Sequence, residues 1–111
     1  ENLYYELPIS FTNAALGTSV EVPSIDGGKS KIKIPAGTQH GKQFRLRGKG
    51  MPVLRGGVFG DLYIRINTQV PTSLTKKQKE ILEEFNEIEK NKPDPVIKSF
   101  FEKAKKFWRN S

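Results

Sequence analysis

Apolar and polar residues alternate in five short stretches of the first 71 residues, the pattern of strands with one buried face. Asp26-Gly27-Gly28 favours a hairpin turn between the second and third stretches. Pro8 places the end of the first strand at a sheet edge, because proline has no backbone donor. "SFTNAALGT" predicts one helical turn that stops at Gly17. Strands of this kind predict a mainly β fold, a small antiparallel β-sandwich. The alternating apolar residues are Leu3, Tyr5, Leu7 and Ile9; Val20 and Val22; Ile32 and Ile34; Phe44 and Leu46; and Leu62, Ile64 and Ile66.

After Pro71 the repeat lengthens from two residues to about 3.6, which indicates helices. Thr75 and Gln78 form a capping box for a helix over about 76–90, whose apolar face holds Ile81, Leu82, Phe85 and Ile88. "KNKPDP" ends this helix, and Asp94 followed by Pro95 predicts the start of a second one. The sequence therefore predicts a β-sandwich over 1–71 and two short C-terminal α-helices within 72–111.

The stretch between residues 44 and 66, "FRLRGKGMPVLRGGVFGDLYIRI", places many glycines and basic side chains between two strands. Two phosphate-binding motifs fail, one over residues 37–43 just before this stretch and one within it. "GTQHGKQ" has one residue too few between its glycines for a Walker loop, and Gln43 replaces the hydroxyl that would reach Mg²⁺. Val53 stands where the dinucleotide pattern needs its third glycine. We interpret the glycines as turn-builders, since glycine permits positive φ.

The chain has 111 residues, of which 35% are hydrophobic and 28% charged, as suits one small soluble domain with an appendage. It contains no cysteine, so it has neither a disulfide nor a thiolate metal site. His40 is the only histidine, which leaves no catalytic triad and no histidine pair for a metal. We therefore expect no enzyme. Because a strand pattern begins at once, without an initiator Met or a secretory signal, we expect a piece of a longer protein.

The net charge of +7 is spread along the chain, with 9 basic and 5 acidic residues in 1–71 and 10 and 7 in 72–111. An excess of this kind favours acidic partners but selects none. One alternative function is a basic nucleic-acid-binding β module that uses Arg45, Arg47, Lys49 and Arg55.

The second helix carries a ridge of large apolar side chains that must be covered. The ridge consists of Ile97, Phe100, Phe101, Ala104, Phe107 and Trp108. It could dock on the chain's own sandwich, on a second copy or on a membrane surface. We favour a second copy, because the helix follows a breaker at the end of the chain and its aromatic rings are typical interface anchors.

The first strand is the other candidate interaction surface. Leu3, Tyr5, Leu7 and Ile9 share one face, and the strand lies at an edge that an extended peptide could join by strand addition. The same parity is also that of ordinary core side chains, so core packing is the alternative for these four residues.

Several stretches resemble the second C-terminal domain of bacterial DnaJ co-chaperones. The most specific are "IPAGTQHGKQFRLRGKGMP" and "RGGVFGDLYIRI", and "NLYYELPISFTNAALGTSVEVPSIDG" is similar to the start of that domain. The resemblance implies a cytoplasmic, homodimeric chaperone that holds unfolded polypeptide clients for DnaK. It also implies that a turn signature shapes the fold without performing chemistry. The matching positions are Gly48, Gly50, Pro52, Gly56, Gly57, Gly60 and Asp61.

The resemblance also predicts what these residues do not supply. The family's J-domain, through which DnaK is engaged, and its four CxxCxGxG zinc modules are absent from the sequence. We therefore expect the piece to need no cofactor, to bind no zinc and to leave DnaK unstimulated by itself. Membrane binding is not expected.

Overall fold

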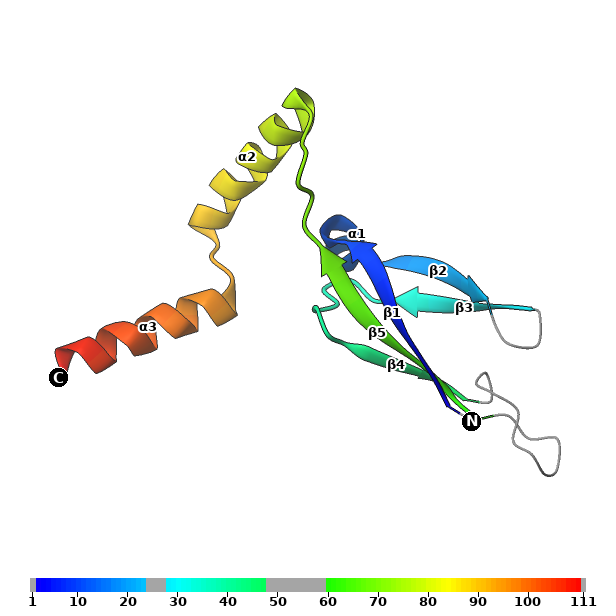
Figure 1. Ribbon diagram of the computed structural model, residues 1–111. Coiled ribbons are helices and arrows are strands. Elements are labelled where there is room, and N and C mark those ends of the chain that lie inside the picture. The colour runs from blue at the N-terminus through cyan, green and yellow to red at the C-terminus, as the bar shows by residue number, and fades with distance from the viewer. Residues whose placement is uncertain (1, 24–27, 48–59, 111) are drawn as a thin grey trace. The chain divides into compact units, whose positions relative to one another are not determined.

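The computed structural model describes residues 2–23, 28–47 and 60–110 (Figure 1). The chain divides into two units, Glu1–Pro71 and Thr72–Ser111. The first unit holds all the described strands and one short helix; the second holds two helices. The elements of the first unit are β1 (Leu3–Ser10), α1 (Phe11–Leu16), β2 (Thr18–Pro23), β3 (Lys29–Ile34), β4 (Gln43–Leu46) and β5 (Leu62–Gln69). Those of the second are α2 (Lys76–Asn91) and α3 (Pro95–Arg109).

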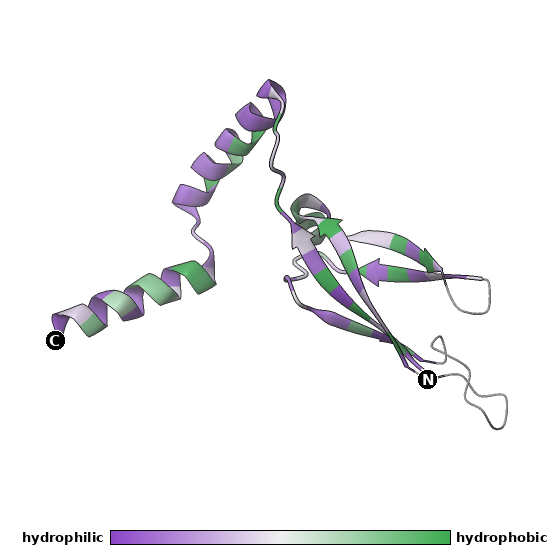
Figure 2. Ribbon diagram, viewed as in Figure 1, coloured by the Kyte–Doolittle hydropathy of each residue, from purple (hydrophilic) through white to green (hydrophobic). Residues whose placement is uncertain are grey.

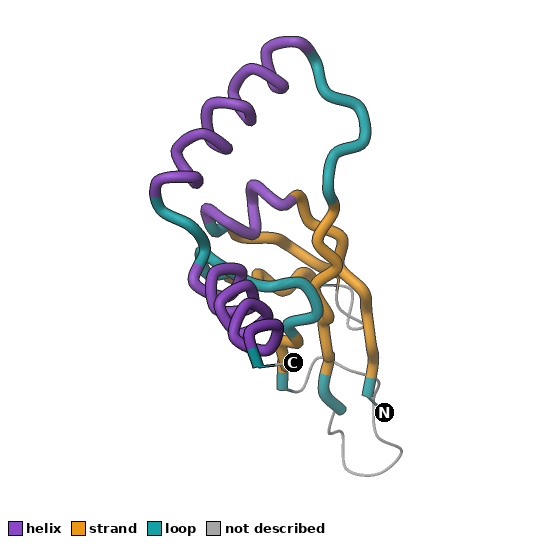
Figure 3. Tube along the Cα trace, turned by 90° about the vertical axis from the view of Figure 1, so that its left-hand side faces the viewer, coloured by secondary structure: helices purple, strands orange, loops and turns teal. Residues whose placement is uncertain are grey.

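The strands of the first unit form two sheets (Figure 3). One sheet has the order β1-β5-β4, with β5 between its two neighbours, and the other pairs β2 with β3. β4 runs antiparallel to β5, and β2 runs antiparallel to β3 with Val20 opposite Ile32. β1, by contrast, runs parallel to β5, with Leu3 opposite Leu62 and Ser10 opposite Gln69.

The core lies between the apolar faces of the two sheets. Leu62, Ile64 and Ile66 on β5 are fully buried, at 0% exposure, because β5 has a strand on each side and apolar residues in front of it. The other core residues are Ile9, Ala14, Val22, Ile32 and Ile34, with Leu3, Leu7, Val20, Phe44 and Leu46 packed against them. Residues from both sheets therefore form one cluster, as the predicted sandwich requires.

α1 closes one end of the first unit. Ser10 caps it by accepting a hydrogen bond from the Asn13 N–H at 3.1 Å, and Ala14 on its inner side joins the core. The helix ends at Gly17, whose φ of +86° belongs to the left-handed region that glycine favours. A Cβ at this position would lie 3.0 Å from the Ala36 backbone nitrogen, so glycine is required here for both conformation and space.

Local signals define both helices of the second unit. Thr75 and Gln78 form the complete capping box at the start of α2. Asp94 Oδ1 accepts hydrogen bonds from the backbone N–H groups of Val96 and Ile97 at 2.9 and 3.3 Å at the start of α3. Lys106 and Arg109 lie in the last turn of α3, where cations complement the helix dipole. Neither helix has a buried residue.

The predicted mainly β fold followed by two C-terminal helices is confirmed, and the predicted strand faces match the core. One pairing corrects the prediction of a fully antiparallel sandwich: β1 and β5 are parallel, which makes that sheet mixed. A tight hairpin enforces antiparallel pairing, but β1 and β5 are joined through three intervening strands, which permit either direction. The predicted turn residues Asp26 and Gly27 lie outside the described residues.

Replacing Gly17 by Ala should destabilise the first unit more than replacing Gly37 by Ala. Both glycines have positive φ, +86° and +81°, but a Cβ at Gly37 would meet nothing within 4 Å. We expect Gly37→Ala to cost about 1–2 kcal/mol from backbone strain alone and Gly17→Ala at least about 1 kcal/mol more. Urea unfolding of the two variants measures the difference, and equal losses would contradict the packing assigned to Gly17.

Candidate functional site

The outer edge of β1 is the first candidate site. Among the described strands β1 pairs only with β5, so its other edge is open. The Leu3 N–H donates a hydrogen bond to the Asp61 carbonyl at 2.9 Å. Because the direction of the backbone groups alternates along a strand, the N–H and C=O groups of the odd-numbered residues of β1 point toward β5. The even-numbered residues Tyr4, Glu6 and Pro8 therefore direct their backbone groups toward the open edge. Pro8 adds a carbonyl there but no donor.

The four predicted client-binding side chains lie on the inner face of β1. Ile9 is 6% exposed and belongs to the core, and Leu3 and Leu7 pack against that core while remaining half-buried. Tyr5 is 37% exposed and is the most accessible of the four. A groove formed by these side chains stays a prediction, whereas the open backbone edge beside them is a feature of the fold.

Two tyrosines stack on the outer face of the mixed sheet. Tyr4 on β1 lies opposite Tyr63 on β5, with ring centroids 5.1 Å apart and planes 10° from parallel. The sequence alone did not single out this pair, because cross-strand partners follow from the parallel register of β1 and β5. The stack gives the edge strand a rigid aromatic support on its solvent side.

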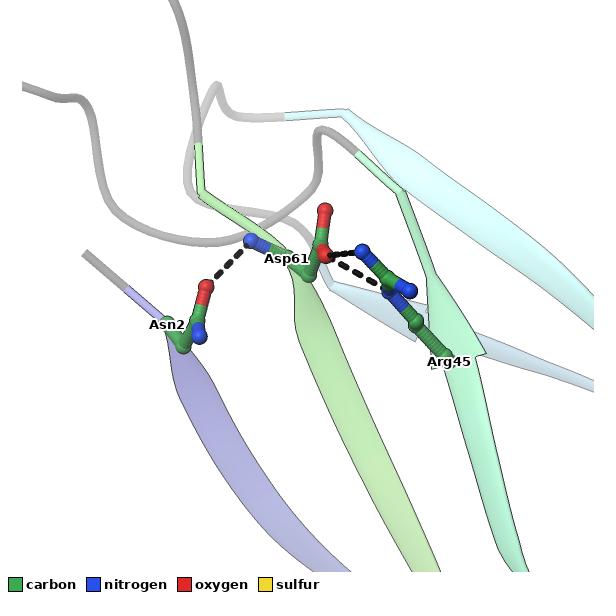
Figure 4. A network of polar contacts seen from close by, with 3 residues as sticks. All are labelled: Asn2, Arg45 and Asp61. Atoms are coloured by element: carbon green, nitrogen blue, oxygen red, sulfur yellow. Dashed lines mark hydrogen bonds and ion pairs between the residues drawn. The ribbon is translucent and has the colours of Figure 1, made fainter.

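Asp61 fastens the start of β5 to both neighbouring strands (Figure 4). Its backbone N–H donates to Asn2 Oδ1 at 2.8 Å, at the start of β1. Its carboxylate accepts a hydrogen bond from Arg45 Nε at 2.6 Å and is also paired with Nη2 of the same guanidinium. The hydrogen bond and the negative charge of Asp61 raise the pKa of Arg45 above its ordinary value. The guanidinium of Arg45 on β4 is thus bound to a carboxylate of the same sheet.

The remaining turn-signature and basic residues are only partly described. Gly60 and Asp61 directly precede β5. Arg47, at the end of β4, is exposed. The other members of both predicted sets, Gly48, Lys49, Gly50, Pro52, Arg55, Gly56 and Gly57, lie outside the described residues.

His40 has a structural role that the sequence analysis missed. Its Nδ1 accepts a hydrogen bond from the Thr68 N–H at 3.0 Å, so it provides an acceptor for this donor of β5 just before β4 begins. The loop position of His40 gave no sign of this contact.

The second candidate site is the apolar ridge of α3, which consists of Ile97, Phe100, Phe101, Ala104, Phe107 and Trp108. These positions share one side of the helix, and Figure 2 shows hydrophobic residues recurring along it. Its large side chains are between 57% and 81% exposed. Phe100 and Phe101 meet edge to face with ring centroids 5.3 Å apart. The ridge is thus a broad aromatic surface on a well-capped helix.

Within residues 2–23, 28–47 and 60–110, no three His, Cys, Asp or Glu side chains come together as a set of metal ligands. In the same part of the chain no helix has the length and hydropathy needed to cross a bilayer. The chain contains no cysteine, so none of its residues belongs to the zinc-binding cysteine modules of the family.

Two models of known protein families match the chain. The family model described as "DnaJ C terminal domain" matches residues 1–71, and a second, "Chaperone protein DnaJ C-terminal region", matches residues 77–110.

Among curated relatives, the Chaperone protein DnaJ of Pelagibacter ubique is 64% identical over 99% of the chain and 29% of its own length. Those of Rhodobacter capsulatus and of a Ruegeria species are 54% and 51% identical, each over 96% of the chain and 28% of the relative. The chain thus spans less than a third of the length of these relatives. With its β unit matched throughout, the chain belongs to the DnaJ C-terminal domain family.

Proposed function

We propose that the chain is the part of a cytoplasmic DnaJ-type chaperone that joins two copies and helps to hold an unfolded polypeptide. Residues 1–71 would contact the client, and residues 72–111 would form the dimer. The observation that carries this proposal is the exposed apolar ridge on α3. Its relatives are named chaperones, and we assign the chain no catalytic step.

Dimerisation follows from the cost of leaving the ridge in water. A helix of 15 residues is marginal on its own, so α3 needs a tertiary or quaternary contact. Complete burial of its five large apolar side chains would contribute about 8–15 kcal/mol as an upper bound. A second copy can supply that contact, and dimers with two-fold symmetry are the commonest soluble oligomers.

Client binding at β1 would use the backbone more than the side chains. An added strand bonds to the outward N–H and C=O groups of the edge, and these groups are the same in every polypeptide. Such an edge therefore accepts many sequences, as a client-holding protein requires. Tyr5, half-buried Leu3 and half-buried Leu7 would supply apolar contact beside that strand.

We assign no contact with DnaK to these 111 residues. Delivery of a client to DnaK would depend on the J-domain that the family resemblance implies. The basic nucleic-acid alternative is weakened by Arg45, whose guanidinium is paired with Asp61 and so is a poor phosphate ligand.

Truncating two rings of the ridge should dissociate the dimer. In Phe101→Ala/Phe107→Ala each copy of the dimer loses two rings, so at about 1 kcal/mol per ring the dimer loses about 4 kcal/mol and its Kd should rise roughly 1,000-fold. Sedimentation equilibrium measures the change. Glu102→Ala/Lys106→Ala, on the opposite side of α3, is the matched control and should remain dimeric, since alanine also favours the helix. A wild-type chain that is monomeric at micromolar concentration would refute the proposal.

Removing one outward donor from β1 should weaken client binding. Glu6→Pro deletes an N–H that faces the open edge and leaves the bonds to β5 in place. Since one backbone hydrogen bond is worth about 0.5–1.5 kcal/mol, affinity should fall about 3- to 10-fold. Fluorescence anisotropy with labelled, reduced and carboxymethylated α-lactalbumin as the unfolded client measures this affinity.

Glu6→Ala is the control for this experiment, because it removes the carboxylate and keeps the N–H. It should bind the client like wild type. Equal affinity of both variants, with unfolding curves that show an intact sandwich, would exclude strand addition at β1.

A further inference from the structure

α2 carries a second apolar surface that dimerisation through α3 alone does not explain. Ile81, Phe85 and Ile88 lie on one side of α2, and each is more than half exposed, at 52–61%. Leu82 on the same side is half-buried. Figure 2 shows the hydrophobic residues of α2 recurring along the helix, as they do along α3. Like α3, this helix needs an apolar partner.

The two helices have opposite charge. α2 holds four lysines and five glutamates, for a net charge of −1, and its glutamates all fall between residues 80 and 89. α3 holds five basic side chains and one glutamate, for a net charge of +4. The helices therefore attract each other, whereas two α3 helices side by side would bring two strongly basic surfaces together.

The charged residues beside the two apolar surfaces also differ in sign between the helices. Helical spacing places Lys98 and Lys105 along one border of the α3 ridge and Lys103 along the other. On α2 it places Glu84 beside Ile81 and Ile88, and Glu89 beside Phe85, with Lys77 near the helix start.

None of these border glutamates and lysines of the two helices forms an ion pair within the described part of the chain. Glu87, on the far side of α2, is by contrast paired with Lys90 at 2.7 Å. The α3 borders thus present unpaired cations, and the α2 borders present two unpaired carboxylates and, near the helix start, one lysine.

From this complementarity we infer that the ridge of α3 packs on the apolar face of α2 in the second copy, so that the two copies exchange helices. The inference rests on the proposed dimer and specifies what its ridge contacts. Each dimer then contains two equivalent α2–α3 contacts related by the two-fold axis. Apolar burial supplies the affinity, and the flanking charges select α2 over a second α3, as they select partners in coiled coils.

Charge reversal on each helix provides the test. The first variant is Glu84→Lys/Glu89→Lys, which makes α2 basic. The second is Lys103→Glu/Lys105→Glu, which places acidic residues on both borders of α3. Glutamate and lysine are equally good helix formers, so both helices should be preserved. Alone, each variant opposes like charges at both contacts, and its dimer Kd should rise at least tenfold by sedimentation equilibrium.

An equimolar mixture of the two variants should dimerise again. One of its contacts then joins basic α2 to acidic α3, and the other joins native α2 to native α3. Far-side reversals, Glu83→Lys and Lys106→Glu, are the controls and should leave the dimer unchanged. Raising the ionic strength should weaken the wild-type dimer more than Glu84→Gln/Glu89→Gln, because salt screens the charges that this neutral variant lacks.

The other outcomes each identify a different arrangement. A Glu84→Lys/Glu89→Lys variant that dimerises like wild type would overturn the inference and leave self-pairing of α3, with the proposed dimer intact. Two monomeric variants that keep an intact sandwich and fail to rescue each other would indicate that α2 and α3 pack within one chain, which also overturns it. A wild-type chain without self-association would instead remove the proposed function.

Discussion

The exposed apolar ridge of α3 is the constraint on which this account depends. A capped helix of 15 residues holds five large hydrophobic side chains that the described chain leaves more than half exposed. Its caps and charges define where the helix begins and ends, but they contribute about 1 kcal/mol each, too little to compensate for that exposure. The ridge therefore makes the second unit depend on an additional surface. Under the proposed function, a second copy of the chain would supply that surface.

The β unit, by contrast, buries its large apolar side chains against its own strands and α1. β5 lies between β1 and β4 with its apolar face fully buried, and Asp61 fastens its start to both neighbours. Among the described strands β1 pairs with β5 alone, so its other edge is open. A stable sandwich with one open edge and a helix with one uncovered ridge form a natural combination. In the proposed function the first would hold a client chain, and the second would bring two such edges into one dimer.

Much of this fold could be predicted from the sequence because it depends on local signals. The alternation in β5 predicted its buried face, and the Thr75–Gln78 capping box predicted the start of α2. Three features could not be predicted, because each depends on residues that lie far apart in the chain. They are the parallel direction of β1 beside β5, the Tyr4–Tyr63 stack, and the hydrogen bond from the Thr68 N–H to His40. The side chains expected to bind clients all lie on one face of the first strand, and this is the face that buries Ile9 in the core.

Helix content measured while the dimer dissociates tests the central claim most directly. The far-UV circular dichroism of the wild-type chain should be followed on serial dilution, together with its mass by light scattering. If the ridge is covered by a second copy, helical signal should fall as the mass halves, and the β signal should persist. A chain that keeps its full helical signal as a monomer would contradict the account, because α3 would then be stable without a partner.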